Sequence, residues 1–421
     1  MTQTTLPDVS INYLDGRLGG AGFSNDGVAA MILSGVAIPI DAAAGTGFDL
    51  GTTLGPFFGI KEIQEQGITA EYDTANSLKV YAHCVDFYRQ AGEGAELYLM
   101  LVPKTVTMAE MLDIANADYA TKLLQKLKGR IKLLGVGRVP DAAYEAATTP
   151  LEELDPDVVA ALLNANTLVK VEQDLHRPMQ VLIEGRDFQG NAAVVSDLRT
   201  QTANRVSICL GWHDDIYAGS WLGLVLGKVA GVPVQRNIAR VKDGNLGIQK
   251  AYVVTATAPT AKKTVEEYGH GNLKLLHQKG YIIPRAYPSL AGYYLNDDPV
   301  AVAVTTDYNS ISRGRVADKA ARIAYQVYVR ELLDDFVLEG GKLPTALIKA
   351  FEQSIKKQLD LQMTNNAEVS SVTPIIDPNQ DVIATSELRV TLDIEPVGTA
   401  RKITVDLGFV NPNNPTTTTA S

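Results

Sequence analysis

Two short runs near the C-terminus alternate between apolar and polar residues with a period of two. Their apolar positions are Leu388, Val390, Leu392 and Ile394 in the first run, and Ile403, Val405, Leu407 and Phe409 in the second. A period of two places such side chains on one face of a β-strand. Two strands alone are marginally stable in water, because their apolar face and their edges stay uncovered. We therefore expect these strands to pair with other β-structure.

The N-terminal segment LPDVSINYLDG shows the same alternation over a shorter length. Val9, Ile11 and Tyr13 alternate with polar residues, and the glycine-rich stretch of residues 16–22 follows them. Glycine has wide backbone freedom, so this stretch favours a flexible connection. The sequence thus predicts a strand on a flexible arm at each end of the chain.

The region between residues 27 and 241 has a different pattern. Short apolar runs predict buried strands, and they are GVAAMILSG, ELYLMLV, RIKLLGVG, MQVLIEG and RVSICLG. Helical periodicity lies between them, over residues 74–91, 107–127 and 155–176. Alternation of strands and helices predicts an α/β fold with a mainly parallel sheet that helices cover on both faces.

The pattern changes again near residue 280. An aromatic, turn-rich stretch is followed by helical periodicity over residues 315–336 and 343–363. We therefore expect an N-terminal arm over residues 1–25, α/β structure over 26–280, an α+β domain over 281–396, and a C-terminal arm over 397–421. The polar end of this last arm, NPNNPTTTTAS, has the composition of a disordered tail.

Composition narrows the class of protein. Hydrophobic residues make up 46 % of the 421 positions, and the net charge of −10 argues against a dedicated nucleic-acid binder. Cys84 and Cys209 both lie in apolar runs, so we expect buried, reduced thiols and no disulfide. No apolar run reaches the ~18 residues of a membrane-spanning helix, and no signal peptide is visible. These features predict a soluble protein that is made in the cytoplasm.

The sequence offers little for catalysis. The motifs GxGxxG, GxxxxGK[ST], GxSxG, CxxC and HExxH are all missing from it. The densest polar cluster is His213-Asp214-Asp215, where neighbouring side chains point in different directions. We interpret this cluster as the N-terminus of a helix over SWLGLVLGKVAG, where carboxylates complement the helix dipole. We therefore expect no enzyme activity, no cofactor and no metal.

A basic stripe remains to be explained. Arg315, Lys319 and Arg322 occupy positions i, i+4 and i+7 and so share one helix face, and Asp318 is placed to pair with Arg315 or Arg322. Two interpretations stay open. The stripe is either a solvated face with local ion pairs or a surface that docks against an acidic partner.

Three segments of the downstream half resemble phage-type contractile tail sheath proteins. They are GKVAGVPVQRNIARVKDG, KGYIIPRAYPSLAGYYLNDD and DYNSISRGRVADKAARIAYQVYVRELLDD. The lead of residues 6–19 resembles the start of a branch of that family long filed as uncharacterised. The likeness covers both ends and most of residues 222–410, and it is weaker between about residues 140 and 201.

This resemblance implies a structural subunit that polymerises helically around an inner tube and contracts to drive the tube through a target envelope. It implies an outer α/β domain, a domain that faces the tube, and terminal arms that add strands to neighbouring subunits. Residues 8–14 and 403–409 would then be donated, and residues 385–395 would belong to the acceptor sheet. The linker of residues 396–402 spans at most ~23–25 Å.

The resemblance also implies the partners of the chain. They would be further copies of itself, the inner tube protein, which the basic stripe would face, and baseplate and terminator proteins. The location would be a phage tail or a related injection machine, assembled in the bacterial host cytoplasm, with no membrane insertion. Two alternatives stay open: another shell or fibre subunit with swapped termini, and an enzyme with an unrecognised site. Whether the last two strands form a local hairpin is also open.

Overall fold

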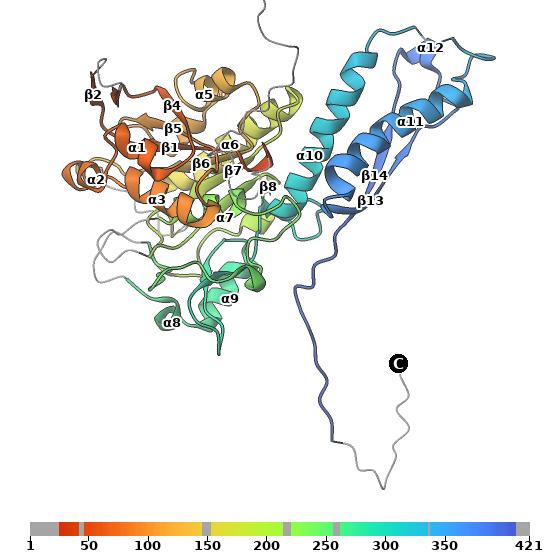
Figure 1. Ribbon diagram of the computed structural model, residues 1–421. Helices are drawn as coiled ribbons and strands as arrows, with labels where there is room; N and C mark the ends of the chain where they lie inside the picture. The colour runs from red at the N-terminus through yellow and green to blue at the C-terminus, as the bar shows by residue number, and fades with distance from the viewer. Residues whose placement is uncertain are drawn as a thin grey trace, which may run out of the picture.

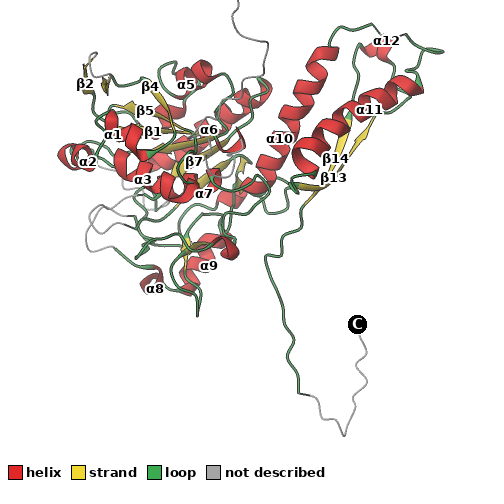
Figure 2. Cartoon of the chain, viewed as in Figure 1, coloured by secondary structure: helices red, strands yellow, loops and turns green. Residues whose placement is uncertain are grey.

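The computed structural model describes residues 25–41, 46–144, 153–213, 220–255, 262–335 and 337–409 (Figure 1). Figure 2 shows a large α/β body, a smaller helix-and-strand region beside it, and an extended C-terminal arm. The helices are α1 Ile60–Glu65, α2 Ala70–Asn76, α3 Val80–Ala91, α4 Met108–Leu112, α5 Ala120–Leu127, α6 Pro156–Asp174, α7 Leu222–Ala230, α8 Val265–Tyr268, α9 His270–Gln278, α10 Ile311–Tyr328, α11 Thr345–Leu359 and α12 Val382–Thr385.

The body is built on a six-stranded sheet with the order β4-β5-β1-β6-β7-β9. Four pairings in it are parallel, and the edge strand β4 is antiparallel to β5. Every residue of β1, β5, β6, β7 and β9 is buried, as expected for strands that helices cover on both faces. The strands of this sheet are β1 Ala29–Ser34, β4 Thr53–Phe57, β5 Leu97–Val102, β6 Leu133–Gly137, β7 Gln180–Glu184 and β9 Val206–Cys209. The predicted α/β class with a mainly parallel sheet is confirmed.

Helices α3 and α7 pack closely as one layer, and α4 and α6 pack together as another. The close approach of α3 and α7 depends on glycines of α7. A Cβ at Gly223 would overlap the carbonyl oxygen of His83, and a Cβ at Gly227 would overlap that of Phe87. The sequence GKVAG and the preceding glycine thus let two helix backbones approach each other directly.

The predicted helix boundaries need correction at several places. The helix predicted over residues 74–91 is two helices, because Ser77 takes a left-handed conformation with φ 48° after α2. The segment predicted as one helix over residues 107–127 holds α4 and α5. The helix predicted to end at residue 336 ends at Tyr328. The helix over SWLGLVLGKVAG is confirmed as α7, whereas Asp214 and Asp215 lie outside the described residues.

A second, smaller core joins α10 and α11 to the antiparallel pair β13 Val369–Ile375 and β14 Thr391–Pro396. The acceptor strand predicted over residues 385–395 is corrected here, since its first residues form the end of α12 and an irregular stretch. Leu388 and Val390 pack in that stretch against a third small cluster around Phe351. The N-terminal part of α10 is embedded in the body, whereas its C-terminal part belongs to this smaller region (Figure 1).

The other strands form short two-stranded sheets. They are β2 Ile38–Asp41 with β3 Thr46–Phe48, β8 Thr202–Ala203 with β12 Ala301–Val302, and β10 Pro284–Arg285 with β11 Tyr294–Leu295. Residues 281–302 pack in the larger core of the body. The predicted domain boundaries stay predictions. Both cysteines are buried and free, as expected. Among the described helices, none combines the length and the apolar character that crossing a bilayer requires.

Candidate assembly surfaces

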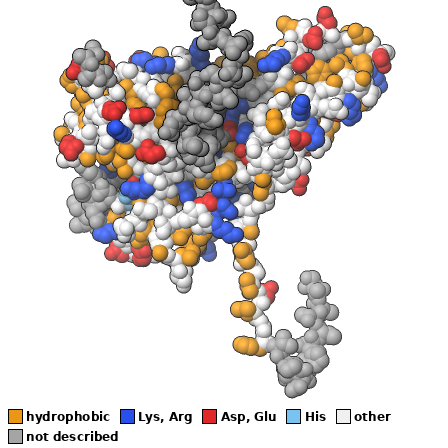
Figure 3. Space-filling model, in the orientation of Figure 1, with side chains coloured by type: hydrophobic (Ala, Val, Ile, Leu, Met, Phe, Trp, Pro, Cys, Tyr) orange, Lys and Arg blue, Asp and Glu red, His pale blue; other side chains and the backbone are white. Residues whose placement is uncertain are grey.

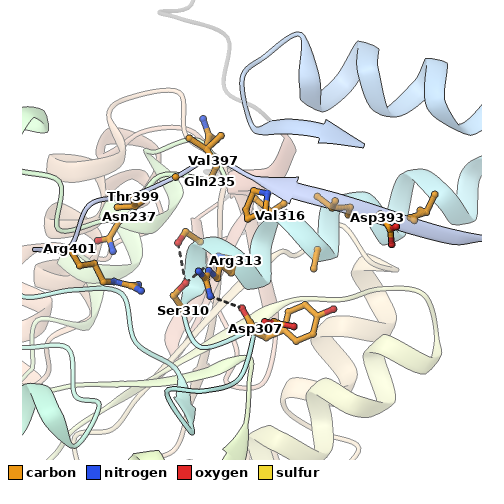
Figure 4. Close-up of a pocket in the computed structure, with 17 residues that line it drawn as sticks. Gln235, Asn237, Asp307, Ser310, Arg313, Val316, Asp393, Val397, Thr399 and Arg401 are labelled. Carbon is orange, nitrogen blue, oxygen red and sulfur yellow. Dashed lines mark hydrogen bonds between the residues drawn. The ribbon is translucent and has the colours of Figure 1, made fainter. Parts of the chain in front are cut away.

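A groove runs between α10 and β14. One cavity of about 570 Å³ is lined by Val316 and Ala317 of α10 and by Leu392 and Ile394 of β14. A second cavity of about 370 Å³ shares Leu392 and continues past Ala324 and Tyr328 to Leu388 and Val390. Figure 4 shows β14 passing over the α10 side chains of the first cavity. The first cavity also has a polar side, to which Asn237, Arg313 and Arg401 contribute, so the apolar part of the groove is the strip between α10 and β14.

Strand β14 has one hydrogen-bonded neighbour among the described residues, the antiparallel β13. The side chains of Leu392 and Ile394 are half-buried and contact the core that α10 contributes to. A strand at the edge of a two-stranded sheet presents backbone N–H and C=O groups that a further strand can bind. The groove beside β14 is therefore suited to accept an extended segment.

The C-terminal arm has the opposite character. Ile403, Val405, Leu407 and Phe409 are 81 %, 70 %, 93 % and 110 % exposed. The arm leaves the body as an extended chain, and its apolar side chains lie in solvent (Figures 1 and 3). The described residues 403–409 do not pair with β14, so the local hairpin left open by the sequence does not form in this structure.

Arg401 holds the root of the C-terminal arm against the body. Its guanidinium forms ion pairs with Asp297 at 3.1 Å and with Asp298 at 3.3 Å. The amide of Asn237 donates to both carboxylates, at 2.5 and 2.6 Å, and Ser312 N at the start of α10 donates to Asp298 at 2.9 Å. Asp298 is fully buried, and burial together with the charge of Asp297 raises the pKa of Asp298 to about 7.

The basic stripe lies against its own chain. The Arg315 guanidinium is buried and donates to the carbonyls of Val229 at 2.8 Å and Val232 at 3.2 Å, at the C-terminal end of α7. Burial lowers the pKa of Arg315 to about 10. Since this side chain is enclosed by its own chain, the structure contradicts the expectation that Arg315 forms part of a surface for an acidic partner.

The other two cations of the stripe contact Asp26, close to the N-terminal arm. Lys319 pairs with Asp26 at 2.8 Å and with Glu368 at 2.7 Å, and Arg322 pairs with Asp26 at 2.7 Å. Lys319 therefore joins the first described residues to the start of β13. The pairing predicted for Asp318 is wrong, because Asp318 accepts hydrogen bonds from Arg205 at 2.9 Å and Gln180 at 2.8 Å. A tube contact through Lys319 and Arg322 stays a prediction.

The N-terminal strand lies outside the described residues, so Val9, Ile11 and Tyr13 have no observed position. The remaining predicted interface residues fall into two groups. Leu388, Val390, Leu392 and Ile394 line the groove or the stretch before it, and Ile403, Val405, Leu407 and Phe409 lie on the exposed arm. The groove itself was not predicted, because its α10 wall and its β14 wall lie far apart in the sequence.

The crevice in which doubly wound sheets bind ligands is filled in this chain. Strand β1 lies between β5 and β6, so the strand order reverses there. Beyond the carboxyl ends of β1 and β6 the described residues leave about 10 Å³, room for at most one water molecule. The carboxylate of Glu184 accepts a hydrogen bond from Arg138 N at 2.9 Å there, and burial raises its pKa.

The His213 cluster offers no metal site among the described residues. His213 Nε2 lies 2.6 Å from an Asp86 carboxylate oxygen, and the other oxygen of that carboxylate pairs with Arg89 at 3.0 Å. His83 is buried, its Nδ1 accepts from Gly223 N at 3.3 Å, and burial lowers its pKa to about 4. The partners of these histidines are side chains and backbone of the packed α3–α7 layer.

Comparison with solved structures finds chains of contractile assemblies. A chain of the contracted helical sheath of the anti-feeding prophage superposes with a TM-score of 0.61 at 13 % identity, covering 96 % of this chain and 99 % of that one. A chain of the baseplate of the same prophage gives 0.59 at 14 %, over 96 % and 99 %. A chain of the contracted PVC sheath complex of an extracellular contractile injection system gives 0.55 at 11 %, over 97 % and 98 %. The resemblance expected from the sequence is confirmed at the level of the fold.

Comparison of the sequence with curated proteins gives no match. Two family profiles, however, cover nearly the whole chain. The DUF2586 N-terminal domain matches residues 6–299, and the DUF2586 C-terminal domain matches residues 307–414. The chain belongs to the DUF2586 family.

Proposed function

We propose that the chain is the structural subunit of a contractile sheath, which polymerises helically around an inner tube through exchanged terminal β-strands. The observation that carries this proposal is the match between an open groove beside β14 and an exposed, alternating arm on the same chain. The fold shared with chains of contractile injection systems supports it. In the assembly, residues 403–409 of one subunit lie in the groove of the next.

The chemistry of the two surfaces is complementary. Main-chain hydrogen bonds along the β14 edge supply affinity, and the apolar side chains of the arm face Val316, Leu392 and Ile394. A slip of one residue would turn the apolar face to solvent, so the alternation fixes the register. Burying Ile403, Val405, Leu407 and Phe409 removes apolar surface from water, at about 25 cal/mol for each Å².

The arm of a subunit is poorly placed to enter its own groove. Residues 397–400 lead directly from the end of β14 to Arg401, and the ion pairs of Arg401 hold this connection against Asp297 and Asp298. Beyond this anchor the described residues 402–409 are exposed and lead away from β14 (Figure 1). A neighbouring copy is therefore the natural donor, and repetition of the same exchange generates a helical polymer.

Further partners follow from the same role. The sheath would enclose an inner tube and meet baseplate and terminator proteins at its ends, in a phage tail or a related injection machine that is assembled in the host cytoplasm. Residues 8–14 would supply a second donated strand. Contraction would run downhill from a metastable extended lattice, so that subunits slide and rotate while the arms keep them linked.

Electron microscopy of the purified protein tests the proposal. The full chain is expected to form tubes or helical polymers in negative stain. A chain without residues 397–421 is expected to stay a folded monomer, with the thermal unfolding temperature of a full-length monomeric variant. A full chain that stays monomeric at high concentration, together with a deletion that unfolds the body, would contradict strand exchange between copies.

A further inference from the structure

The C-terminal arm has two parts that differ in how they are held. Residues 397–400 run from the end of β14 across the mouth of the groove, and all four are exposed. A Cβ built on Gly398 would meet open space. Arg401 then carries the ion pairs to Asp297 and Asp298, and the described residues 402–409 are exposed. Figure 4 shows Val397, Thr399 and Arg401 passing over Gln235 and Asn237.

Asp297 and Asp298 have hydrogen-bond donors that do not depend on Arg401. Asn237 donates to both carboxylates, Ser312 N donates to Asp298, and Ile311 N donates to the backbone oxygen of Asp298. The side chain of Arg401, by contrast, is 45 % exposed. The arginine can therefore leave into water while the carboxylates keep neutral hydrogen-bond donors.

We propose that Arg401 on Asp297 and Asp298 is a releasable anchor that sets the length of the tether between neighbouring subunits. This inference rests on the proposed function. With the anchor closed, the free tether begins at Lys402. With the anchor open it begins at Val397, five residues earlier, which adds at most about 17 Å of extended chain. Subunits then move apart during contraction without pulling the donated strand out of its groove.

Two further observations agree with this role. Asp298 also caps the start of α10 through Ser312 N and Ile311 N, so the anchor sits on the helix that forms one wall of the groove. The pKa of Asp298 is raised to about 7, so the anchor weakens as this carboxylate takes up a proton near neutral pH. The charged and titratable groups that interact with the pair are Arg401, Arg199, His277 and Arg315: Arg199 interacts with both carboxyls, His277 with Asp297, and Arg315 with Asp298.

A distance measurement on the full chain tests the anchor without an assembled sheath. Spin labels are placed on the variant pair Lys274→Cys and Ala400→Cys, both exposed and the second next to Arg401, in a dilute chain that also carries Val405→Asp to prevent polymerisation. Cys84 and Cys209 are buried and do not compete for the label. With Arg401 intact we expect a narrow distance distribution. Arg401→Gln should broaden it at least twofold, and the neighbouring control Lys402→Gln should leave it unchanged. Equal widths for Arg401→Gln and the control would overturn the anchor.

A second measurement tests the tether. The Arg401→Gln variant keeps residues 403–409 and should still form polymers. We expect these polymers to shorten at a lower urea concentration than polymers of Lys402→Gln. Polymer length in electron micrographs measures this difference. Equal urea midpoints would overturn the role in tether length. If the wild-type chain forms no polymers, the proposed function fails and this role falls with it, while the distance distribution still decides whether Arg401 anchors the arm.

Discussion

The buried carboxyl of Asp298 makes the stability of the fold depend on pH. Burial and the charge of Asp297 raise its pKa to about 7, well above the ordinary value of 3.8. Burial opposes ionisation of Asp297 as well, but the charge of Arg401 and the hydrogen bond from Asn237 outweigh it and lower the pKa of that carboxyl. The two carboxyls therefore behave differently: Asp297 carries the negative charge, and Asp298 gains or loses its proton near pH 7.

A prediction follows for stability. The folded state favours neutral Asp298, so this contribution is complete below pH 4 and is lost as the pH rises through about 7. In the monomeric Val405→Asp chain, Asp298→Asn should reduce the fall in unfolding free energy between pH 5 and pH 8, by at most about 3 kcal/mol. Urea unfolding at several pH values measures this. The exposed carboxylate Asp393 gives the control Asp393→Asn, and the same pH slope in both variants would contradict the prediction.

The alternating residues of the arm give a second prediction at this scale. Ile403→Asp or Val405→Asp places a charge on the face that is buried after donation, and this costs several kcal/mol or shifts the strand out of register. Polymerisation should weaken at least 100-fold, while the monomer keeps its stability because both positions are exposed in it. Sedimentation and thermal unfolding check the two parts. Thr404→Asp, on the opposite face, is the matched control, and an equal defect there would speak against donation.

Helix α10 shows that the spacing of residues along a helix predicts which of them share a face, but not what that face contacts. Arg315, Lys319 and Arg322 share a face, as their spacing predicts, but that face is turned toward Asp26, Glu368 and the end of α7. Asp26 precedes Arg322 by 296 positions. A sequence without an alignment gives no sign of a partner so distant, and a solvated stripe and an enclosed one have the same pattern.

Arg315 is accordingly expected to matter for folding. Its guanidinium donates to Val229 O, Val232 O and Asp26 O, and Arg315→Leu would leave these buried acceptors without a donor. We expect a loss of about 2–4 kcal/mol of unfolding free energy in the Val405→Asp monomer. Arg313→Leu, an exposed arginine on the same helix, should cost less than about 1 kcal/mol. Urea titration distinguishes them, and similar losses would show that Arg315 is not a structural cation.

The elements differ in how far they could be predicted. Five strands of the large sheet (β1, β5, β6, β7 and β9) were predictable, because a parallel strand buried on both faces is a short, continuous apolar run. The antiparallel edge strand β4 was not predicted, since only its two end residues are buried. Strand β13 was missed, since serines and Pro374 interrupt its pattern and only Val369 and Val372 face the core strongly. Leu388 and Val390 alternate like strand residues, yet the left-handed Ser386 precedes them and they pack as irregular chain. Local periodicity does not specify which tertiary neighbour is present.

At the scale of the whole molecule, donor and acceptor occupy separate parts of the chain. Residues 403–409 are exposed, and the groove lies between α10 and β14, where the root of the arm with Arg401 lines its first cavity. An interface whose two halves lie on different surfaces of one subunit is heterologous. Such an interface produces rings or open helices rather than closed dimers. This geometry also means that the two halves can be disabled one at a time.

Mixing two assembly-defective variants provides the sharpest test of this arrangement. Val405→Asp disables the arm and leaves the groove open. Ala317→Arg fills the groove with a long side chain from a half-buried position and leaves the arm intact. Each variant alone should be monomeric, because either defect interrupts the lattice. Their mixture should form 1:1 complexes and no longer polymers, since one intact arm meets one open groove.

Sedimentation of the separate and mixed variants at tens of micromolar or more measures this outcome. Ala321→Arg adds the same side chain to an exposed position of α10, outside the groove, and should polymerise like the wild type. Comparing the two variants distinguishes a defect of the groove from a defect of α10 itself, because both introduced arginines lie on this helix, four residues apart. If the mixture stays monomeric although both variants are folded, residues 403–409 do not bind in the α10–β14 groove. The arm would then have to bind a different surface of the neighbouring subunit.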